Sequence, residues 1–198
     1  MGYFHLNVLF SKKGLERRIM IEEREWRGRW FRATLRNYPL SLILPRKSGF
    51  YREILPGERT LGRFILPPFQ RPSVWTVEQK IKLIESIIDE FPIPPYVVNR
   101  DLDGDYAYDH LLIDGQQRIT AILDFMEDKF PVRGKCYSDV SAIDRTWFED
   151  RPFSCLETNF KDIKILKEIY DRLAYGGTPH EPKNVQNQED RCQTLEPG

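Results

Sequence analysis

An apolar run that passes through Asp-Gly into an amphipathic helix is the feature that most constrains the fold of this chain. Leu111-Leu112-Ile113 is typical of the buried end of a strand, and Asp114-Gly115 follows it directly. Apolar residues then recur at helical spacing, at Ile119, Ile122, Leu123 and Met126. The segment predicts a strand, a tight turn and a helix, which are the parts of an α/β (α+β) domain with helices flanking a small sheet.

A helix that begins directly after such a turn offers a binding place for an anion. Its first N–H groups lack partners within the helix, and its dipole adds about half a positive charge at that end. Gly115 lets a ligand approach the backbone. Gln116 and Gln117 add amide donors, and the guanidinium of Arg118 suits two phosphate oxygens. We therefore predict that residues 114–118 bind phosphate groups.

A second arm of the same site is expected after an earlier strand. The segment 61–66 predicts one strand, which Pro67-Pro68 ends. If this strand lies beside the one that ends at Ile113, Gln70 and Arg71 approach the same ligand from a second side. Trp75, in the same loop, would then supply a wall on which a nucleotide base stacks.

Asp114 is the carboxylate nearest to this site, and two roles are open to it: a ligand of Mg²⁺, or a base that orients water. Asp114 and Arg118 are therefore the candidate catalytic residues. Each residue alone also has a simpler interpretation: an N-cap for Asp114, an ion pair of Arg118 with Asp114 or Asp124, a rigid loop at 70–71, and a core position for Trp75. The complete Gly-Gln-Gln-Arg set after an apolar strand favours a functional role.

Further elements are predicted on either side of the turn. Thr76 and Gln79 have the spacing of a capping box, and the helix that follows carries apolar residues at Val77, Ile81, Ile84 and Ile88. The prolines at 92–95 end it. Residues 96–98 predict a strand, Asp103-Gly104 a hairpin turn, and 106–113 the returning strand. A last helix is expected over 160–174, with an apolar stripe at Ile163, Leu166, Tyr170 and Leu173.

Charge and composition divide the chain into three predicted segments: a basic, poorly defined arm at 1–57, a folded domain at 58–180 and a polar tail at 181–198. Residues 1–52 carry twelve Lys and Arg against four Asp and Glu, although the whole chain is formally neutral. Basic and aromatic side chains mix over 24–32 and can contact DNA, but a poorly ordered arm with solvated charges is the favoured explanation, because short basic runs are common.

Several classes of protein are not supported by the sequence. Cys136, Cys155 and Cys192 form no CxxC pair, so neither a zinc knuckle nor a disulfide framework is expected. No apolar run approaches the ~20 residues that a membrane span needs. The start of the chain lacks the basic segment of a secretory signal. A cytoplasmic protein without a membrane partner is the expectation.

Two motifs of the sequence resemble a known family. They are Ile65 to Trp75, which contains Gln70-Arg71, and Leu112 to Thr120, which contains Asp-Gly-Gln-Gln-Arg. Both strongly resemble the GmrSD-type DGQQR domain, found at the N-terminus of type IV modification-dependent restriction enzymes. The likeness covers about 58–180 and includes the later segment 172–179.

The resemblance implies a ParB/sulfiredoxin-like fold that binds and hydrolyses nucleoside triphosphates in the restriction of modified foreign DNA. A non-catalytic module, gated by nucleotide and sensing DNA, is the alternative. Relatives continue into an HNH-type nuclease domain, but His5, His110 and His180 form no His-Asn-His cluster here, so a separate nuclease subunit is a possible partner. Gln116 stands where sulfiredoxins carry their reactive cysteine, which argues against thiol chemistry.

Overall fold

The computed structural model describes residues 31–47, 52–101 and 107–175. By its internal contacts the chain divides into Met1–Arg32 and Ala33–Gly198, and every element below belongs to the second unit. The described residues therefore contain most of the predicted domain at 58–180. The basic and aromatic run at 24–30 and the polar tail at 181–198 lie outside them, as does His180.

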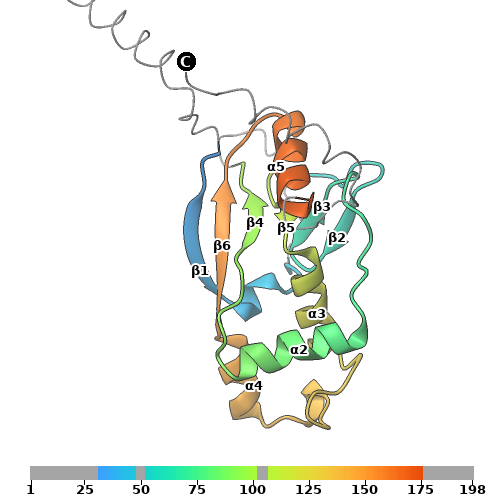
Figure 1. Ribbon diagram of the computed structural model, residues 1–198, viewed down its shortest axis with the longest axis vertical. Helices are drawn as coiled ribbons and strands as arrows, with labels where there is room; N and C mark the ends of the chain where they lie inside the picture. Colours follow the sequence, from blue (N-terminus) through green and yellow to red (C-terminus); the bar gives the residue numbers. More distant parts are fainter. Residues whose placement is uncertain (1–30, 48–51, 102–106, 176–198) are drawn as a thin grey trace, which may run out of the picture. The chain divides into compact units, whose positions relative to one another are not determined.

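Six strands form one mixed sheet in the order β1-β6-β4-β5-β3-β2 (Figure 1). β3 runs parallel to β5 and β4 parallel to β6, while the other three neighbouring pairs are antiparallel. This sheet and its helices confirm the predicted α/β class, and the closer likeness to the ParB/sulfiredoxin fold stays a prediction. In chain order the strands are β1 (Thr34–Pro39), β2 (Arg59–Leu61), β3 (Phe64–Leu66), β4 (Tyr96–Asn99), β5 (Leu111–Asp114) and β6 (Pro152–Thr158).

Helices cover both faces of the sheet, because alternate residues of the buried central strands point to opposite sides. One face packs against α2 (Val77–Ile88), α3 (Gln116–Met126) and α4 (Ala142–Glu149), and the other against α5 (Ile163–Tyr175). Two short 3₁₀ helices, η1 (Leu40–Ile43) and η2 (Tyr137–Asp139), complete the elements. The core on the α5 side consists of Ile65, Val97, Leu111, Ile113, Leu166, Ile169 and Tyr170.

The predicted single strand at 61–66 is wrong, because the structure shows a tight hairpin there. β2 and β3 pair antiparallel, with Leu61 opposite Phe64 and only Gly62 and Arg63 between them. Gly62 has a φ of +54°, and a Cβ on it would lie 2.1 Å from the carbonyl oxygen of Ile43. The glycine is thus the residue that allows the turn to pack against the end of η1.

The returning strand is shorter than the 106–113 that the sequence predicts. β5 begins at Leu111, and residues 107–110 form turns before it. His110 explains the break, since its φ of +60° is incompatible with a strand. The predicted Asp103-Gly104 turn lies outside the described residues.

Five of these elements have no counterpart in the sequence predictions: β1, α4, β6 and the two 3₁₀ helices. β1 falls within the predicted arm at 1–57, yet it pairs with β6 over six positions, from Thr34 opposite Glu157 to Pro39 opposite Pro152. β6 lies between β1 and β4 and is an interior strand of the sheet. The folded unit therefore reaches further toward the N-terminus than residue 58.

The first predicted helix is confirmed, including its capping box. The hydroxyl of Thr76 accepts from the N–H of Gln79, and the Gln79 side chain accepts from the N–H of Thr76. The buried stripe is shifted from the predicted one: Leu83, Ile84 and Ile87 are buried, whereas Val77 is exposed. In the described part of the chain, every helix is too short or too polar to cross a lipid bilayer.

Cys136 and Cys155 are free, as the sequence predicts, while Cys192 lies outside the described residues. Cys155 is fully buried in β6, and burial raises the pKa of its thiol to about 12. A thiol with so high a pKa stays neutral, so Cys155 packs as a small apolar side chain.

His110 is buried at the start of β5, within a network of charged groups. Its Nδ1 lies 2.6 Å from Oδ2 of Asp109, and its Nε2 lies 3.3 Å from Nη1 of Arg46. A guanidinium can only donate, so Nε2 accepts and the ring is neutral. Burial, with the nearby Arg100 and Arg46 charges, lowers the pKa of His110, although Asp109 acts in the opposite direction.

The lowered pKa of His110 predicts that the protein loses stability in mild acid. The unfolded chain takes up a proton below about pH 6.5, whereas the folded chain resists doing so until a lower pH. The free energy of unfolding should therefore be constant above about pH 7 and fall below it, by at most about 1.4 kcal/mol per pH unit for one proton. Urea unfolding at pH 7.5, 6.5 and 5.5 measures this slope.

His110→Asn is the matched variant for that experiment, because asparagine tolerates the positive φ of this position and does not titrate. The variant should lose most of the decrease between pH 7 and pH 5.5. An unchanged slope in His110→Asn would assign the acid sensitivity to other groups.

Candidate functional site

The β3–α2 loop and the β5–α3 turn lie at one edge of the sheet. β3 and β5 are parallel neighbours, with Ile65 opposite Leu111, so their carboxyl ends point the same way. Residues 67–76 leave β3 there, and Asp114 and Gly115 lead from β5 into α3. The prediction that Gln70 and Arg71 form a second arm of the site required these two strands to be neighbours, and they are.

Gly115 is the N-cap of α3, and only glycine fits its position. Its φ is +102°, and a Cβ there would lie 2.5 Å from Cβ of the buried Tyr96. The N-cap residue has no side chain with which to cap this helix start, no other described side chain accepts from it, and the first turn contains no acidic residue. The open N–H groups and the helix dipole are thus left available to a ligand, as an anion site requires.

Arg118 is held in place by the groups around it. One Nη atom donates to Oδ2 of Asp114 at 2.8 Å and to the carbonyl of Pro95 at 3.1 Å. Its Nε is buried and has no acceptor among the described residues. The pair with Asp124 considered from the sequence does not form, because Asp124 binds Lys80 and Lys129 instead.

All of the predicted site residues, Gln70, Arg71 and Trp75 together with residues 114–118, line one pocket of about 200 Å³. The side chain of Asp114 is 38% exposed and that of Arg118 is 17% exposed. A carboxylate and a guanidinium therefore both meet solvent at the start of α3. The structure brings the predicted residues together, and which of them bind a ligand stays a prediction.

The wall formed by α5 was not predicted as part of the site. Tyr170, Leu173 and Ala174 line the same pocket. The Tyr170 hydroxyl accepts from the N–H of Arg71 at 3.4 Å, and its ring packs on Phe69. Helical spacing identifies Tyr170 and Leu173 only as an apolar stripe, and the sheet topology is needed to place that stripe beside the loop.

Three glutamines connect the two segments of the site. Gln70 is buried, and its Nε2 donates to the carbonyls of Leu112 and Ile113 in β5. Oε1 of Gln117 accepts three hydrogen bonds from the β3–α2 loop. Their donors are Ser73 Oγ at 2.8 Å, Val74 N at 3.0 Å and Trp75 N at 3.1 Å.

Gln116 makes the remaining connection. Its amide fits the surroundings in the orientation in which Nε2 donates to the carbonyl of Arg71 and to Oε1 of Gln70, both at 3.0 Å. Its Oε1 then accepts from the N–H of Ser73 at 3.2 Å. The side chains of Gln116 and Gln117 thus face the loop that carries Arg71 and Trp75.

Arg71 and Trp75 differ in how firmly they are held. Trp75 is partly buried and packs against the larger core. Arg71 is exposed, and its guanidinium has no hydrogen-bond or ion-pair partner among the described residues. Arg71 is consequently the cation of the pocket that can reorient toward a ligand at little cost.

The pocket offers one carboxylate to a metal ion. No group of three or more His, Cys, Asp or Glu side chains that could hold a metal occurs among the described residues. Asp114 alone suits Mg²⁺, which usually keeps several waters and binds one or two carboxylates together with substrate phosphates. A magnesium ion would therefore have to arrive with its phosphate ligand.

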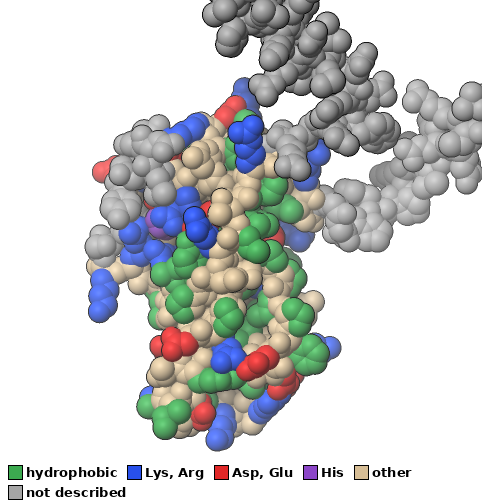
Figure 2. Space-filling view, turned by 90° about the vertical axis from the view of Figure 1, so that its left-hand side faces the viewer, with side chains coloured by type: hydrophobic (Ala, Val, Ile, Leu, Met, Phe, Trp, Pro, Cys, Tyr) green, Lys and Arg blue, Asp and Glu red, His purple; other side chains and the backbone are tan. Residues whose placement is uncertain are grey.

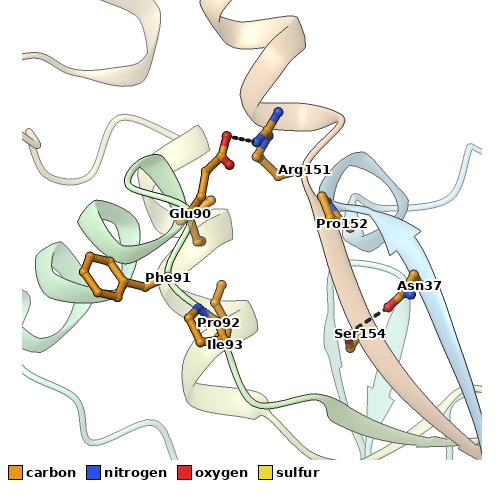
Figure 3. A pocket seen from close by; sticks show the side chains of 9 residues that line it. Asn37, Glu90, Phe91, Pro92, Ile93, Arg151, Pro152 and Ser154 are labelled. Carbon is orange, nitrogen blue, oxygen red and sulfur yellow. Dashed lines mark hydrogen bonds and ion pairs between the residues drawn. The ribbon is translucent and has the colours of Figure 1, made fainter.

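A second pocket, of about 350 Å³, lies between the end of α2 and the start of β6 (Figure 3). Glu90 and Arg151 form an ion pair beside it, and Ser154 donates to Asn37. The guanidinium of Arg151 also stacks on Trp147, at 3.9 Å from the ring centre. None of the predicted site residues lines this pocket.

Comparisons with known proteins identify one family. Residues 51–196 match the family described as "GmrSD restriction endonuclease, N-terminal domain". A search of curated proteins and a search of solved structures each gave no match. The matched range contains both segments of the site and the α5 wall, but neither β1 nor η1.

Proposed function

Because the chain belongs to the family of GmrSD restriction endonuclease N-terminal domains, we propose that it binds a nucleoside triphosphate and hydrolyses it in the restriction of modified foreign DNA. The phosphates bind at the start of α3. In the sequence, the three histidines stand far apart and none belongs to a His-Asn-His pattern. DNA cleavage therefore falls to another domain or to a separate nuclease subunit.

The observation that supports phosphate binding best is the uncapped start of α3 between two arginines. The N-terminus of α3 has no side-chain cap among the residues that the structure describes. Arg118 lines the pocket from α3 and Arg71 from the neighbouring loop. Backbone N–H groups, a helix dipole and two guanidinium groups that converge on one pocket are the usual means of holding phosphate.

The two candidate catalytic residues take different roles in this proposal. Arg118 is already oriented by Asp114 and Pro95, so it can neutralise phosphate charge without a large loss of side-chain freedom. Asp114 holds Mg²⁺ or orients the attacking water, and the structure leaves both roles open. When bound, the ion would neutralise part of the phosphate charge. Trp75 supplies the wall for the base.

Calorimetric titration with ATP, GTP, CTP and UTP, with Mg²⁺ present, tests the proposal on the wild-type chain. Release of inorganic phosphate is measured on the same samples. Binding together with release supports the full proposal. No binding of any of the four nucleotides would overturn it.

Arg71→Ala is expected to weaken triphosphate binding about 10- to 100-fold, the usual effect of losing a charge-assisted hydrogen bond. The melting temperature should stay within a degree or two of the wild-type value, because the Arg71 side chain has no partner among the described residues. Titration and thermal unfolding measure the two quantities.

Lys82→Ala is the control for Arg71→Ala. Lys82 is exposed on α2, so this variant also removes one positive charge, away from the pocket. Affinity should change less than twofold at 0.15 M salt, where long-range attraction is screened. Equal losses in both variants would mean that net charge, and not a contact of Arg71, governs binding.

A second candidate is a nucleotide-gated module that contacts DNA and does not turn over. It is favoured by a group of arginines at the opposite end of β5. Burial, together with the charges of the nearby Arg46 and Arg100, lowers the pKa of Arg63 there. Figure 2 shows several Lys and Arg side chains gathered on one face of the molecule. A nucleotide-induced rise in melting temperature without phosphate release would support this candidate over the enzyme.

A further inference from the structure

We propose that the side chains of Gln116 and Gln117 are positioning residues, which clamp the β3–α2 loop so that Arg71 and Trp75 face the start of α3. The backbone N–H groups of the same two residues remain the phosphate donors. This inference rests on the proposed function only for its effect on nucleotide binding. The clamp itself is a property of the protein without a ligand.

Gln117 carries the strongest part of the clamp. Its single Oε1 atom accepts from three successive loop residues, Ser73, Val74 and Trp75, within 3.1 Å. Two of these donors are backbone N–H groups of a loop that has no strand partner at that point. A phosphate that took Gln117 as a ligand by rotating its amide would release all three bonds, which is costly.

Gln116 and Gln70 extend the clamp to the sheet. Gln70 is anchored on the carbonyls of β5, and its Oε1 accepts from Gln116. Gln116 also binds the carbonyl of Arg71 and the N–H of Ser73. From Gln70 to Trp75 each loop residue except Pro72 thus has a backbone or side-chain bond to one of the three glutamines.

Tyr170 holds the loop from the other side. Its hydroxyl accepts from the N–H of Arg71. The backbone of Arg71 is therefore fixed by Tyr170 and Gln116 together, while its guanidinium stays without a partner among the described residues. Because its backbone is held, Arg71 stays beside the pocket, while its guanidinium can still reorient toward a ligand.

The two glutamines use different atoms of their amide groups. Replacing each with glutamate should therefore have opposite effects at positions 116 and 117. Oε1 of Gln117 acts as an acceptor, so the carboxylate of Gln117→Glu can replace it, and a negative charge is favourable at a helix start. Gln116 donates through Nε2 to two oxygens. Gln116→Glu would place a carboxylate oxygen against those oxygens and repel them.

Hydrogen exchange of the nucleotide-free full chain measures the clamp directly. The N–H groups of Ser73, Val74 and Trp75 should exchange slowly in the wild type. Gln117→Met should speed exchange at Val74 and Trp75 on the order of tenfold, the effect of losing one hydrogen bond. Gln117→Glu should keep them slow, whereas Gln116→Glu should speed exchange at Ser73. Slow exchange at Ile122 and Leu123 of α3 verifies that each variant is folded.

Titration of the double variant shows whether Gln116 acts through Arg71, whose carbonyl it binds. If it does, Arg71→Ala weakens nucleotide binding far less in the Gln116→Met background than in the wild type, since the backbone of Arg71 is then already released. If Gln116 binds phosphate itself, the two losses multiply. Gln116→Glu is left out of this comparison, because its added charge repels the nucleotide in either case.

The outcomes separate the clamp from the proposed function. Exchange that is equally fast in Gln117→Glu and Gln117→Met, or unchanged in both, would overturn the clamp. Multiplying losses in the double variant would assign Gln116 to the phosphate. Exchange as expected, in a chain that binds none of the four nucleotides, would keep the clamp and reject the proposed function.

Discussion

Asp114→Asn is expected to reduce phosphate release on the order of 10²- to 10⁴-fold, while the affinity for the triphosphate is kept or increased. Asparagine cannot accept a proton from water, and its neutral amide is a weaker ligand for Mg²⁺. The carboxylate also repels phosphate, so its removal favours binding. Steady-state phosphate release and calorimetric titration on the same sample separate the two effects.

The control for Asp114→Asn must account for the lost ion pair with Arg118, which lies at 2.8 Å. Thermal unfolding shows whether the loss of this ion pair lowers the stability of the protein. Asp150→Asn is the charge control, because it removes an exposed carboxylate after α4, away from the pocket. Wild-type turnover in Asp114→Asn would remove Asp114 from the reaction. A fall in affinity equal to the fall in turnover would make it a binding residue instead.

Gly115→Ala is expected to lower the free energy of unfolding by roughly 2–5 kcal/mol. Two effects add: a non-glycine residue is strained at a φ of +102°, and the new Cβ would lie 2.5 Å from Cβ of Tyr96. Tyr96 is buried between Phe64 and Phe153, so it cannot move aside without disturbing the core. Urea unfolding followed by circular dichroism measures the loss.

Gly134→Ala is the matched control, because Gly134 also has a positive φ, of +76°, but a Cβ there meets nothing within 4 Å. It should cost only the backbone strain, about 1 kcal/mol. The difference between the two variants isolates the contact with Tyr96. Equal losses would show that backbone strain alone makes glycine necessary at position 115.

The parts of the fold that were predicted correctly are those with strong local signals. The capping box at Thr76 and Gln79 and the apolar positions of α3 are encoded within a few residues, and both are present. The turn at Gly115 is local in the same sense. The site residues lie together because β3 and β5 are parallel neighbours. The sequence analysis had to assume this pairing, since no local pattern predicts which strands are neighbours.

The missed elements lack such signals. Every residue of β1 except Tyr38 is exposed, so no alternation of apolar residues marks it, and its pairing with β6 defines it. β6 does alternate, with Phe153 and Cys155 buried on either side of Ser154, but the pattern is short and begins at a proline. The hairpin at Gly62 was hidden because a two-residue turn within six residues resembles one continuous strand.

The orientation of the glutamine side chains was beyond sequence reasoning for another reason. Gln116 and Gln117 are donors and acceptors at once, and their position at a helix start suggested contact with phosphate. Their bonds to residues 71–75 depend on a loop about 40 positions away in the chain. Only the three-dimensional structure shows which partner each amide has.

The pairing of β1 with β6 also bears on how this domain should be produced for experiments. A fragment cut to the family match, residues 51–196, would lack β1 and leave the backbone N–H and C=O groups of β6 bare along six positions. Such an unprotected strand edge is a template for strands of other molecules, and therefore for aggregation. Expression boundaries taken from the family match alone would turn the interior strand β6 into an exposed edge strand.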